Sequence, residues 1–308
     1  MAMDRLGFWA RVRAVVLIVL ATLTASTALS TPATAAPDAE GWRTVVQYAP
    51  SVFLYSTDSY RPATTADFLS HSNLRWAHDQ SCADHELAAR GHVDVTRLGT
   101  GGYQHQTASA WPFCDHHDHQ YRSTDFTRPR GGVVGGEGFF LDLDNAARHG
   151  VGRAAPVYFE YQAHKFVTYW FFYAFNNAPL SVADHEGDWE RISVRLDSNN
   201  QATQVAYYIH ASYCTVPWSD VASPQSHPVA YSADGTHASY PTAGAHGLDD
   251  TDQGPQWHTW ANLQDVRDQA WYGYGGGWGE VGDTEASTGP VGPSPYKSPA
   301  PTDWAKPC

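Results

Sequence analysis

The sequence predicts a mainly β protein, an antiparallel β-sandwich with short flanking helices and long loops. The chain contains 12 tryptophan, 17 tyrosine and 12 phenylalanine residues, and aromatic residues favour the pleated, half-buried surface of a strand. Its apolar runs have the length of strands and are joined by polar turns, without the regular strand–helix alternation of a parallel sheet. Both observations favour a sandwich of short antiparallel strands.

Runs of β-branched and aromatic residues predict the individual strands. The clearest runs are 155–162, 166–175, 189–196 and 203–211, with the polar segment DSNNQA as the turn before the last of them. A short helix is expected over 64–76, where Thr64 can cap apolar residues at helical spacing. Residues 77–137 are polar and rich in histidine and glycine, which predicts a long surface excursion.

The first 36 residues have the composition of a secretory signal peptide. Arg5, Arg11 and Arg13 form a basic start, residues 14–23 form an apolar run, and residues 33–36 offer a small-residue cleavage site. The apolar run is too short to cross a bilayer as a helix. We therefore expect cleavage of residues 1–36 and a single secreted β-rich domain over residues 37–308.

The chain is acidic, with a formal net charge of −13. The expected leader carries three arginines and one aspartate, so its removal changes the net charge to −15. Negative charge disfavours nucleic acid and favours divalent cations as partners. Plain solubility of a secreted protein is the alternative explanation of this charge, so charge alone does not identify the ligand. We expect a monomer that does not bind nucleic acid.

Four cysteines lie in the expected mature chain: Cys82, Cys114, Cys214 and Cys308. An even number of cysteines in an oxidising compartment predicts two disulfides, with three pairings open. We expect Cys82–Cys114 and Cys214–Cys308. The second bridge would hold a C-terminal segment rich in glycine and proline.

The segment DHEGDWERISVRL, Asp184–Leu196, joins an acidic cluster to an alternating strand. Alternate residues of a strand share a face, so Asp188 and Glu190 point the same way as apolar Ile192. Two buried carboxylates side by side are costly and raise each other's pKa. A divalent cation would remove both costs. Oxygen ligands with one histidine, His185, favour Mg, Ca or Mn over Zn.

A salt-bridge cluster is the alternative interpretation, with Arg191 or Arg195 as the partner. These arginines occupy the opposite face of their own strand, which favours the metal. The segment is not a zincin helix, because Trp189 stands where H-E-x-x-H requires its second histidine.

Several motifs together resemble the vacuolar protein sorting-associated protein 62 family. They are HEGDWERISVRL, IHASY, VAYSADGTHASYP and GPVGP, in this order, preceded by YAPSVFLYSTDSYRP and YWFFYAFNNAP. The resemblance covers most of the expected mature chain, although an insertion around residues 100–135 and the cysteines depart from it. The family has no well-established chemistry, and the leader peptide favours an exported role over a sorting role.

HEGDWE also resembles, more distantly, the G-H-R-H-D-W-E heptad of the necrosis-inducing proteins of plant pathogens. This resemblance implies a β-sandwich that binds a divalent metal through His185, Asp188 and Glu190. Asn177 takes the place of an upstream aspartate, which keeps a carbonyl ligand but removes one charge. Those relatives are cytolysins that dock on sphingolipid head groups, so the resemblance implies a lipid head group or glycan as partner and contact with a membrane surface.

Two histidines and two aromatic residues are candidate ligand contacts. They are His210 and His237, which lie on neighbouring segments, and the aromatic residues Trp189 and Tyr240. We expect Trp189, Tyr240 and also Trp218 to be exposed. Aromatic rings with polar edges suit sugars and head groups. Packing in the core is the alternative for any single aromatic residue.

Two classes of function remain open. The first is a secreted metal-binding protein that recognises a lipid head group or glycan. The second is a metal-dependent hydrolase acting on phosphodiester or phospholipid substrates, with His185, His210 or His237 as acid or base. Binding requires only the ion and a polar, aromatic rim, so we favour it. A purely structural ion is a third alternative.

A further histidine-rich stretch, CDHHDHQ, begins at Cys114. It places His116, His117, Asp118 and His119 side by side. Adjacent residues rarely converge on one ion, so we expect a solvated loop.

Overall fold

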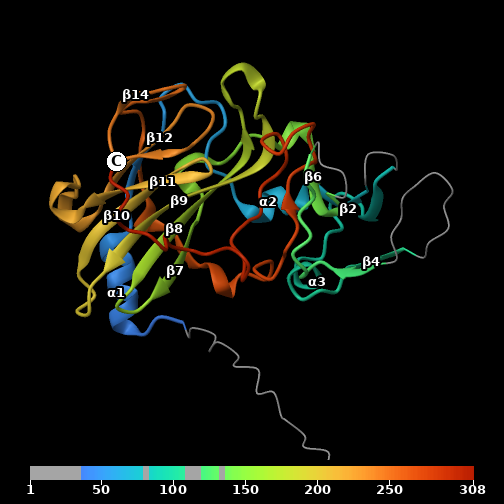
Figure 1. Ribbon diagram of the computed structural model, residues 1–308, viewed down its shortest axis with the longest axis horizontal. Helices are drawn as coiled ribbons and strands as arrows, with labels where there is room; N and C mark the ends of the chain where they lie inside the picture. Colours follow the sequence, from blue (N-terminus) through green and yellow to red (C-terminus); the bar gives the residue numbers. More distant parts are fainter. Residues whose placement is uncertain (1–35, 79–82, 108–118, 132–135) are drawn as a thin grey trace, which may run out of the picture. The chain divides into compact units, whose positions relative to one another are not determined.

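The computed structural model describes residues 36–78, 83–107, 119–131 and 136–308. Its centre is a six-stranded sheet with the order β11-β10-β9-β8-β7-β17 (Figure 1). The strands are β7 (Val157–Gln162), β8 (Phe166–Asn176), β9 (His185–Leu196), β10 (Ala202–Ile209), β11 (Ser212–Pro217) and β17 (Leu263–Asp265). Neighbouring strands are antiparallel except β7 and β17, which are parallel.

Two four-stranded sheets accompany the central sheet. The first, β13-β12-β1-β16, consists of β1 (Ser51–Phe53), β12 (Val229–Ser232), β13 (Ser239–Tyr240) and β16 (Gln256–His258). The second, β18-β6-β2-β3, consists of β2 (Ser72–Ala77), β3 (His85–Ala88), β6 (Gly138–Leu143) and β18 (Gly277–Trp278). Two two-stranded sheets pair β4 (Gln104–Thr107) with β5 (His119–Arg122) and β14 (Gly244–His246) with β15 (Asp249–Thr251).

The helices are short. They are α1 (Ala39–Tyr48), α2 (Thr65–Ser70) and α3 (Val95–Gly99), and Asp38, Thr64 and Asp94 cap them by accepting a backbone N–H. The 3-10 turns are η1 (Asn145–Ala147), η2 (Gly152–Ala154), η3 (Pro179–Ser181), η4 (Trp218–Asp220), η5 (Pro224–Ser226), η6 (Thr259–Ala261) and η7 (Val266–Asp268). None of the helices in the described residues is long and apolar enough to span a membrane.

One hydrophobic core covers the first face of the central sheet. Phe171 of β8 and Ile192 of β9 pack in one buried cluster with Val45 of α1, Val52 of β1 and Trp257 of β16. Burial of this apolar surface stabilises the contact between the sheets. The face of β9 that alternation marked as apolar is therefore in the core.

A second core covers the opposite face. Trp170 and Trp189 of the central sheet belong to a buried cluster with Leu74 of β2, Phe139 of β6 and Trp278 of β18.

The predicted mainly β class and the predicted short helices are confirmed. The arrangement differs from a two-sheet antiparallel sandwich in two respects, since the central sheet is covered on both faces and each large sheet contains a parallel pair.

The helix expected over 64–76 is only half as long. α2 ends at Ser70, and β2 begins at Ser72 and pairs with β6. Leu74 and Trp76 alternate toward the second core, so pairing with a distant strand outweighs the local helical spacing.

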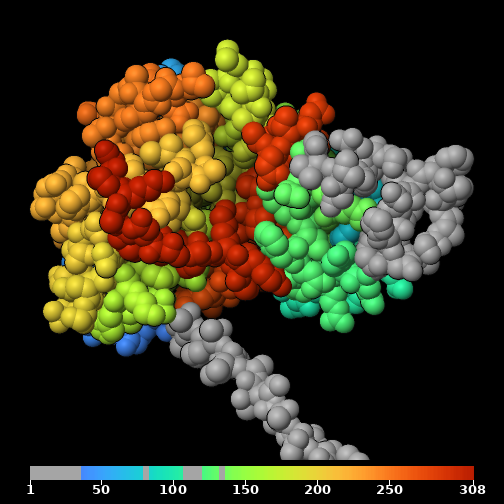
Figure 2. Space-filling view, viewed as in Figure 1, coloured from blue at the N-terminus to red at the C-terminus, as the bar shows by residue number. Residues whose placement is uncertain are grey.

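The C-terminal segment is fixed to the central sheet. A disulfide joins Cys214 of β11 to Cys308, as expected, and the backbone N–H of Thr215 donates to the Lys306 carbonyl at 2.7 Å. The Thr168 hydroxyl donates to the Pro299 carbonyl at 3.0 Å. Figure 2 shows this segment, in red, lying across the surface. The expected Cys82–Cys114 bridge lies outside the described residues.

Loss of the bridge should destabilise the protein. It closes a loop of 94 residues, so Cys214→Ser should lower the free energy of unfolding by about 2–4 kcal/mol. Denaturant unfolding of oxidised protein comprising residues 37–308 measures this change. Cys308→Ser removes the same bridge and should lose an equal amount. Losses below about 0.5 kcal/mol in both variants, the size of an ordinary surface substitution, would contradict the prediction.

Candidate functional site

The acidic segment identified in the sequence forms the beginning of β9. The register places Asp188 opposite Tyr173 and Glu190 opposite Phe171 of β8. The two acidic residues are only 5% and 7% exposed. They therefore stand at the start of the core-facing row of β9, where an unpaired charge is costly.

His237 lies between two carboxylates. Its Nδ1 is 2.8 Å from an Asp188 oxygen, and its Nε2 is 3.1 Å from an Asp58 oxygen and 2.9 Å from the Tyr60 carbonyl. Its ring stacks on Tyr173 with centroids 3.8 Å apart. Burial alone would lower the pKa of His237, but the bonds to Asp188 and Asp58 outweigh it and raise this pKa to about 9.

His237 is thus a buried imidazolium that positions Asp188. Burial opposes ionisation of Asp58, yet the hydrogen bond from His237 holds the pKa of Asp58 below its usual value. His237 is 1% exposed and both of its ring nitrogens are engaged. In this arrangement it offers neither a free nitrogen for acid–base catalysis nor a surface for a ligand.

A second group of contacts surrounds Asp249 of β15. Its carboxylate accepts from the Tyr240 hydroxyl at 2.7 Å and the Thr236 hydroxyl at 2.9 Å, and His210 Nε2 lies 2.9 Å away. The hydrogen bond to Asp249 raises the pKa of His210. The His210 side chain is 54% exposed, whereas Tyr240 is buried at 6%. His210 therefore forms the accessible edge of this group.

Glu190 differs from the paired acids. Within the described residues, its carboxyl group makes no hydrogen bond or ion pair, although the residue is almost completely buried. Burial, and then the charge of Asp188, raises the pKa of Glu190 well above its usual value, and Asp249 contributes in the same direction. Lys297 lies nearby, but burial lowers the pKa of its amino group to about 7, and this group donates to the Val291 carbonyl at 2.9 Å. We call Asp188, Glu190, Asp249 and His210 the β9 site.

The predicted metal set is not assembled in this structure. Asn177 is exposed, and His185 Nδ1 lies 3.1 Å from the Gly187 carbonyl, while burial lowers the pKa of His185.

Among the described residues, three histidine, cysteine or acidic ligand atoms lie within 4.8 Å of one another in only two groups. These groups are Asp142, Glu186 and Glu280, and His78, His85 and His105. The structure thus contains candidate metal-binding groups, but they differ from the predicted set.

Gly187 separates the acidic residues of the motif. Its φ is +59°, and a Cβ there would lie 2.0 Å from the Trp278 carbonyl oxygen, so the position requires glycine. Glu186 is the residue before Gly187. Its carboxylate accepts a hydrogen bond from the Leu143 N–H at 2.8 Å and lies 3.3 Å from the Arg148 guanidinium. Burial raises the pKa of Glu186 to about 7.

Trp189 is not the exposed ligand contact that we expected. It is 5% exposed and packs among Phe172, Trp271 and Trp278, with ring centroids 4.6, 5.4 and 5.3 Å away. The expectation is wrong because both faces of the central sheet are covered, and only one face could be inferred from alternation.

Asp58 and Asp249 carry no signal in the sequence. Both are single acidic residues in loops or short strands far from β9 in the chain, and no local spacing distinguishes them from solvated acids. His78, His85 and His105 likewise form no local motif, because they are widely spaced in the sequence.

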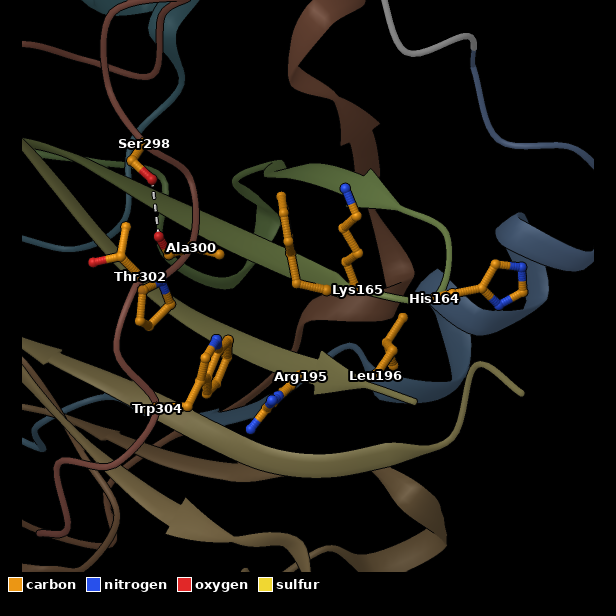
Figure 3. Close-up of a pocket in the computed structure, with 10 residues that line it drawn as sticks. His164, Lys165, Arg195, Leu196, Ser298, Ala300, Thr302 and Trp304 are labelled. Atoms are coloured by element: carbon orange, nitrogen blue, oxygen red, sulfur yellow. Dashed lines mark hydrogen bonds between the residues drawn. The ribbon is translucent and has the colours of Figure 1, made fainter. Parts of the chain in front are cut away.

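A cavity of about 370 Å³ lies elsewhere on the central sheet (Figure 3). Lys165, Arg195 and Trp304 contribute to its lining. Because Phe166 pairs with Arg195 and Asn176 with His185, this cavity is at the opposite end of β8 and β9 from the β9 site. None of the predicted site residues lines it.

Comparisons with known proteins give one distant similarity. No protein-family model and no curated protein matches the chain. Among solved structures, the chain is similar to NLPPya in complex with mannosamine, at 13% identity and a TM-score of 0.35, covering 77% of this chain and 80% of that chain. A TM-score of this size assigns neither family nor ligand, so both family resemblances remain predictions.

The buried imidazolium makes stability depend on pH. The pKa of His237 is about 9 in the folded state and about 6.5 in an unfolded chain. The stabilisation is therefore complete below about pH 6.5 and is lost as the pH rises through 9, by up to about 3 kcal/mol. Urea unfolding of chelator-treated protein between these pH values measures the decrease.

His237→Gln should remove this part of the pH dependence, whereas His92→Gln, at an exposed position, should preserve it. An equal decrease in the wild type and His237→Gln would show that another group is responsible.

Proposed function

We propose that the chain is a secreted binding protein that recognises a polyhydroxyl ligand, a glycan or lipid head group, together with a divalent cation at the β9 site. The observation that carries this proposal is Glu190, a residue only 7% exposed whose carboxyl group has no partner in the described part of the chain. Its neighbours Asp188 and Asp249 are already held by histidines. Glu190 is therefore the acceptor that remains for a ligand.

The chemistry of the site determines the kind of ligand that fits. Asp188, Glu190 and Asp249 offer acceptor oxygens, so a ligand must bring hydrogen-bond donors or positive charge. Sugar hydroxyls and oxygen-preferring cations such as Ca, Mg or Mn meet this requirement. A phosphate would be repelled by these carboxylates unless a cation lies between them.

Exposed aliphatic side chains near the site support contact with a membrane. Leu180 and Val182, in the loop between β8 and β9, are 84% and 66% exposed, and Leu248, beside Asp249, is 77% exposed. We call these three residues the apolar rim. The β8–β9 loop and the β14–β15 hairpin both lie in the upper part of Figure 1, and a large apolar side chain exposed on such a segment is available to an apolar partner.

A metal-dependent hydrolase is the second candidate. One observation favours it, the exposed His210 hydrogen-bonded to Asp249, because such a pair can exchange protons with a substrate. His237 has both nitrogens engaged, and His185 Nδ1 lies against backbone carbonyls. Binding is favoured because it requires no second catalytic group.

Cation binding is tested by thermal unfolding of chelator-treated mature protein with Ca, Mg, Mn or Zn. Ca, Mg or Mn at 100 times its Kd should add about 2.7 kcal/mol of stability. Glu190→Gln should abolish the increase, since it removes the unpartnered carboxylate and preserves its shape.

Glu280→Gln is the matched control, because Glu280 belongs to the other acidic group and the β9 site should be unaffected. No stabilisation by Ca, Mg or Mn, or stabilisation that survives Glu190→Gln, would rule out a cation at the β9 site.

Membrane contact is tested by sedimentation with vesicles that contain a glycosylated sphingolipid. Leu180→Ser with Val182→Ser should weaken vesicle binding at least about tenfold, because two aliphatic side chains contribute about 1–2 kcal/mol each. Stabilisation by the cation should be unchanged in this double variant.

Plain phosphatidylcholine vesicles and a phospholipid hydrolysis assay complete the experiment. Tight binding by the double variant would contradict the role of the apolar rim, and equal binding to plain vesicles would contradict head-group recognition. Product release that depends on His210 would establish the hydrolase instead.

A further inference from the structure

Three histidines converge near the start of the β2–β3 connection. His78 follows β2, His85 begins β3, where it pairs opposite Trp76, and His105 lies in β4. They come from three separate segments, so only the fold brings them together. His78 and His105 are 8% and 4% exposed, and His85 is exposed.

The distances between their ring nitrogens match those of a metal site. His85 Nδ1 is 3.3 Å from His78 Nε2 and 3.0 Å from His105 Nε2. A ring nitrogen carries either one proton or one lone pair, so His85 Nδ1 cannot satisfy both neighbours with full hydrogen bonds. Zn–N bonds of about 2.0–2.1 Å in a tetrahedron place ligand nitrogens about 3.3–3.4 Å apart. A cation bound by the three nitrogens would replace this shared contact with three metal–nitrogen bonds.

The surrounding aromatic residues hold one of the rings in place. Trp76 stacks on His105 with centroids 4.4 Å apart and planes 4° apart. Tyr121 of β5 also stacks on Trp76, at 5.5 Å. Trp76 is fully buried in the second core. The core therefore orients His105 in the absence of a metal, which lowers the cost of binding one.

We propose that His78 Nε2, His85 Nδ1 and His105 Nε2 bind one zinc ion. Imidazole nitrogens suit Zn and related transition metals, whereas Ca, Mg and Mn prefer oxygen. The three histidines supply three of the four positions of tetrahedral zinc, an arrangement that leaves a position for water or another donor. This site shares no residue with the β9 site and does not depend on the proposed function.

The test is zinc titration of untagged, chelator-treated mature protein. Isothermal titration calorimetry measures the affinity, and metal analysis measures the amount of zinc bound. Wild-type protein should bind one zinc ion through these histidines, and His85→Gln should weaken that binding at least tenfold. His85 is exposed, so circular dichroism should show that this variant is folded. His105→Gln is a second variant from the buried side of the site. Cobalt should give the intense visible absorption of a tetrahedral complex in the wild type and not in His85→Gln.

Two controls distinguish this site from other metal-binding groups. Glu190→Gln should retain the zinc, since it changes only the β9 site. Replacement of His116, His117 and His119 with alanine removes the histidine-rich stretch and should also leave the zinc bound. The proposal is overturned if wild-type protein binds no stoichiometric zinc, if His85→Gln retains full affinity, or if the zinc is lost in the triple alanine variant instead.

Discussion

The buried ion pairing of His237 with Asp188 and Asp58 is the interaction on which the arrangement of the β9 site depends. It joins the central sheet to the turn between β12 and β13 and to the loop before α2. Two carboxylates in such a buried region are stable only with a positive partner. Because His237 neutralises much of their charge and Asp249 is bonded to His210, Glu190 is the acid of the β9 site that has no protein partner among the described residues.

Strand alternation predicted a substantial part of this site. It placed Asp188 and Glu190 on the same face as Ile192, and the aromatic runs identified the central strands. It could not predict that Trp189 is buried, because the second core is built from β2, β6 and β18, which are distant in sequence. Asp58 and Asp249 were missed for the same reason, since each is positioned by contacts between distant segments and not by a local motif.

The two proposed metal sites differ in their ligand chemistry. The β9 site presents carboxylate oxygens, which suit an oxygen-preferring cation such as Ca, Mg or Mn. The site of His78, His85 and His105 presents three imidazole nitrogens beside Trp76, which suits zinc. The histidine-rich stretch CDHHDHQ lies in the same part of the chain, but the three histidines that converge in the structure are isolated in the sequence. Only the pairing of β2 with β3 and the packing of Trp76 on His105 bring them together.

A crystal structure of the mature chain grown with calcium would test whether Glu190 is the open ligand of the β9 site. We expect an anomalous peak from an ion about 2.3–2.6 Å from a Glu190 carboxylate oxygen, the usual Ca–O distance, with His237 still bonded to Asp188. A Glu190 side chain hydrogen-bonded to protein groups, with calcium absent or bound only at Glu280, would contradict this assignment.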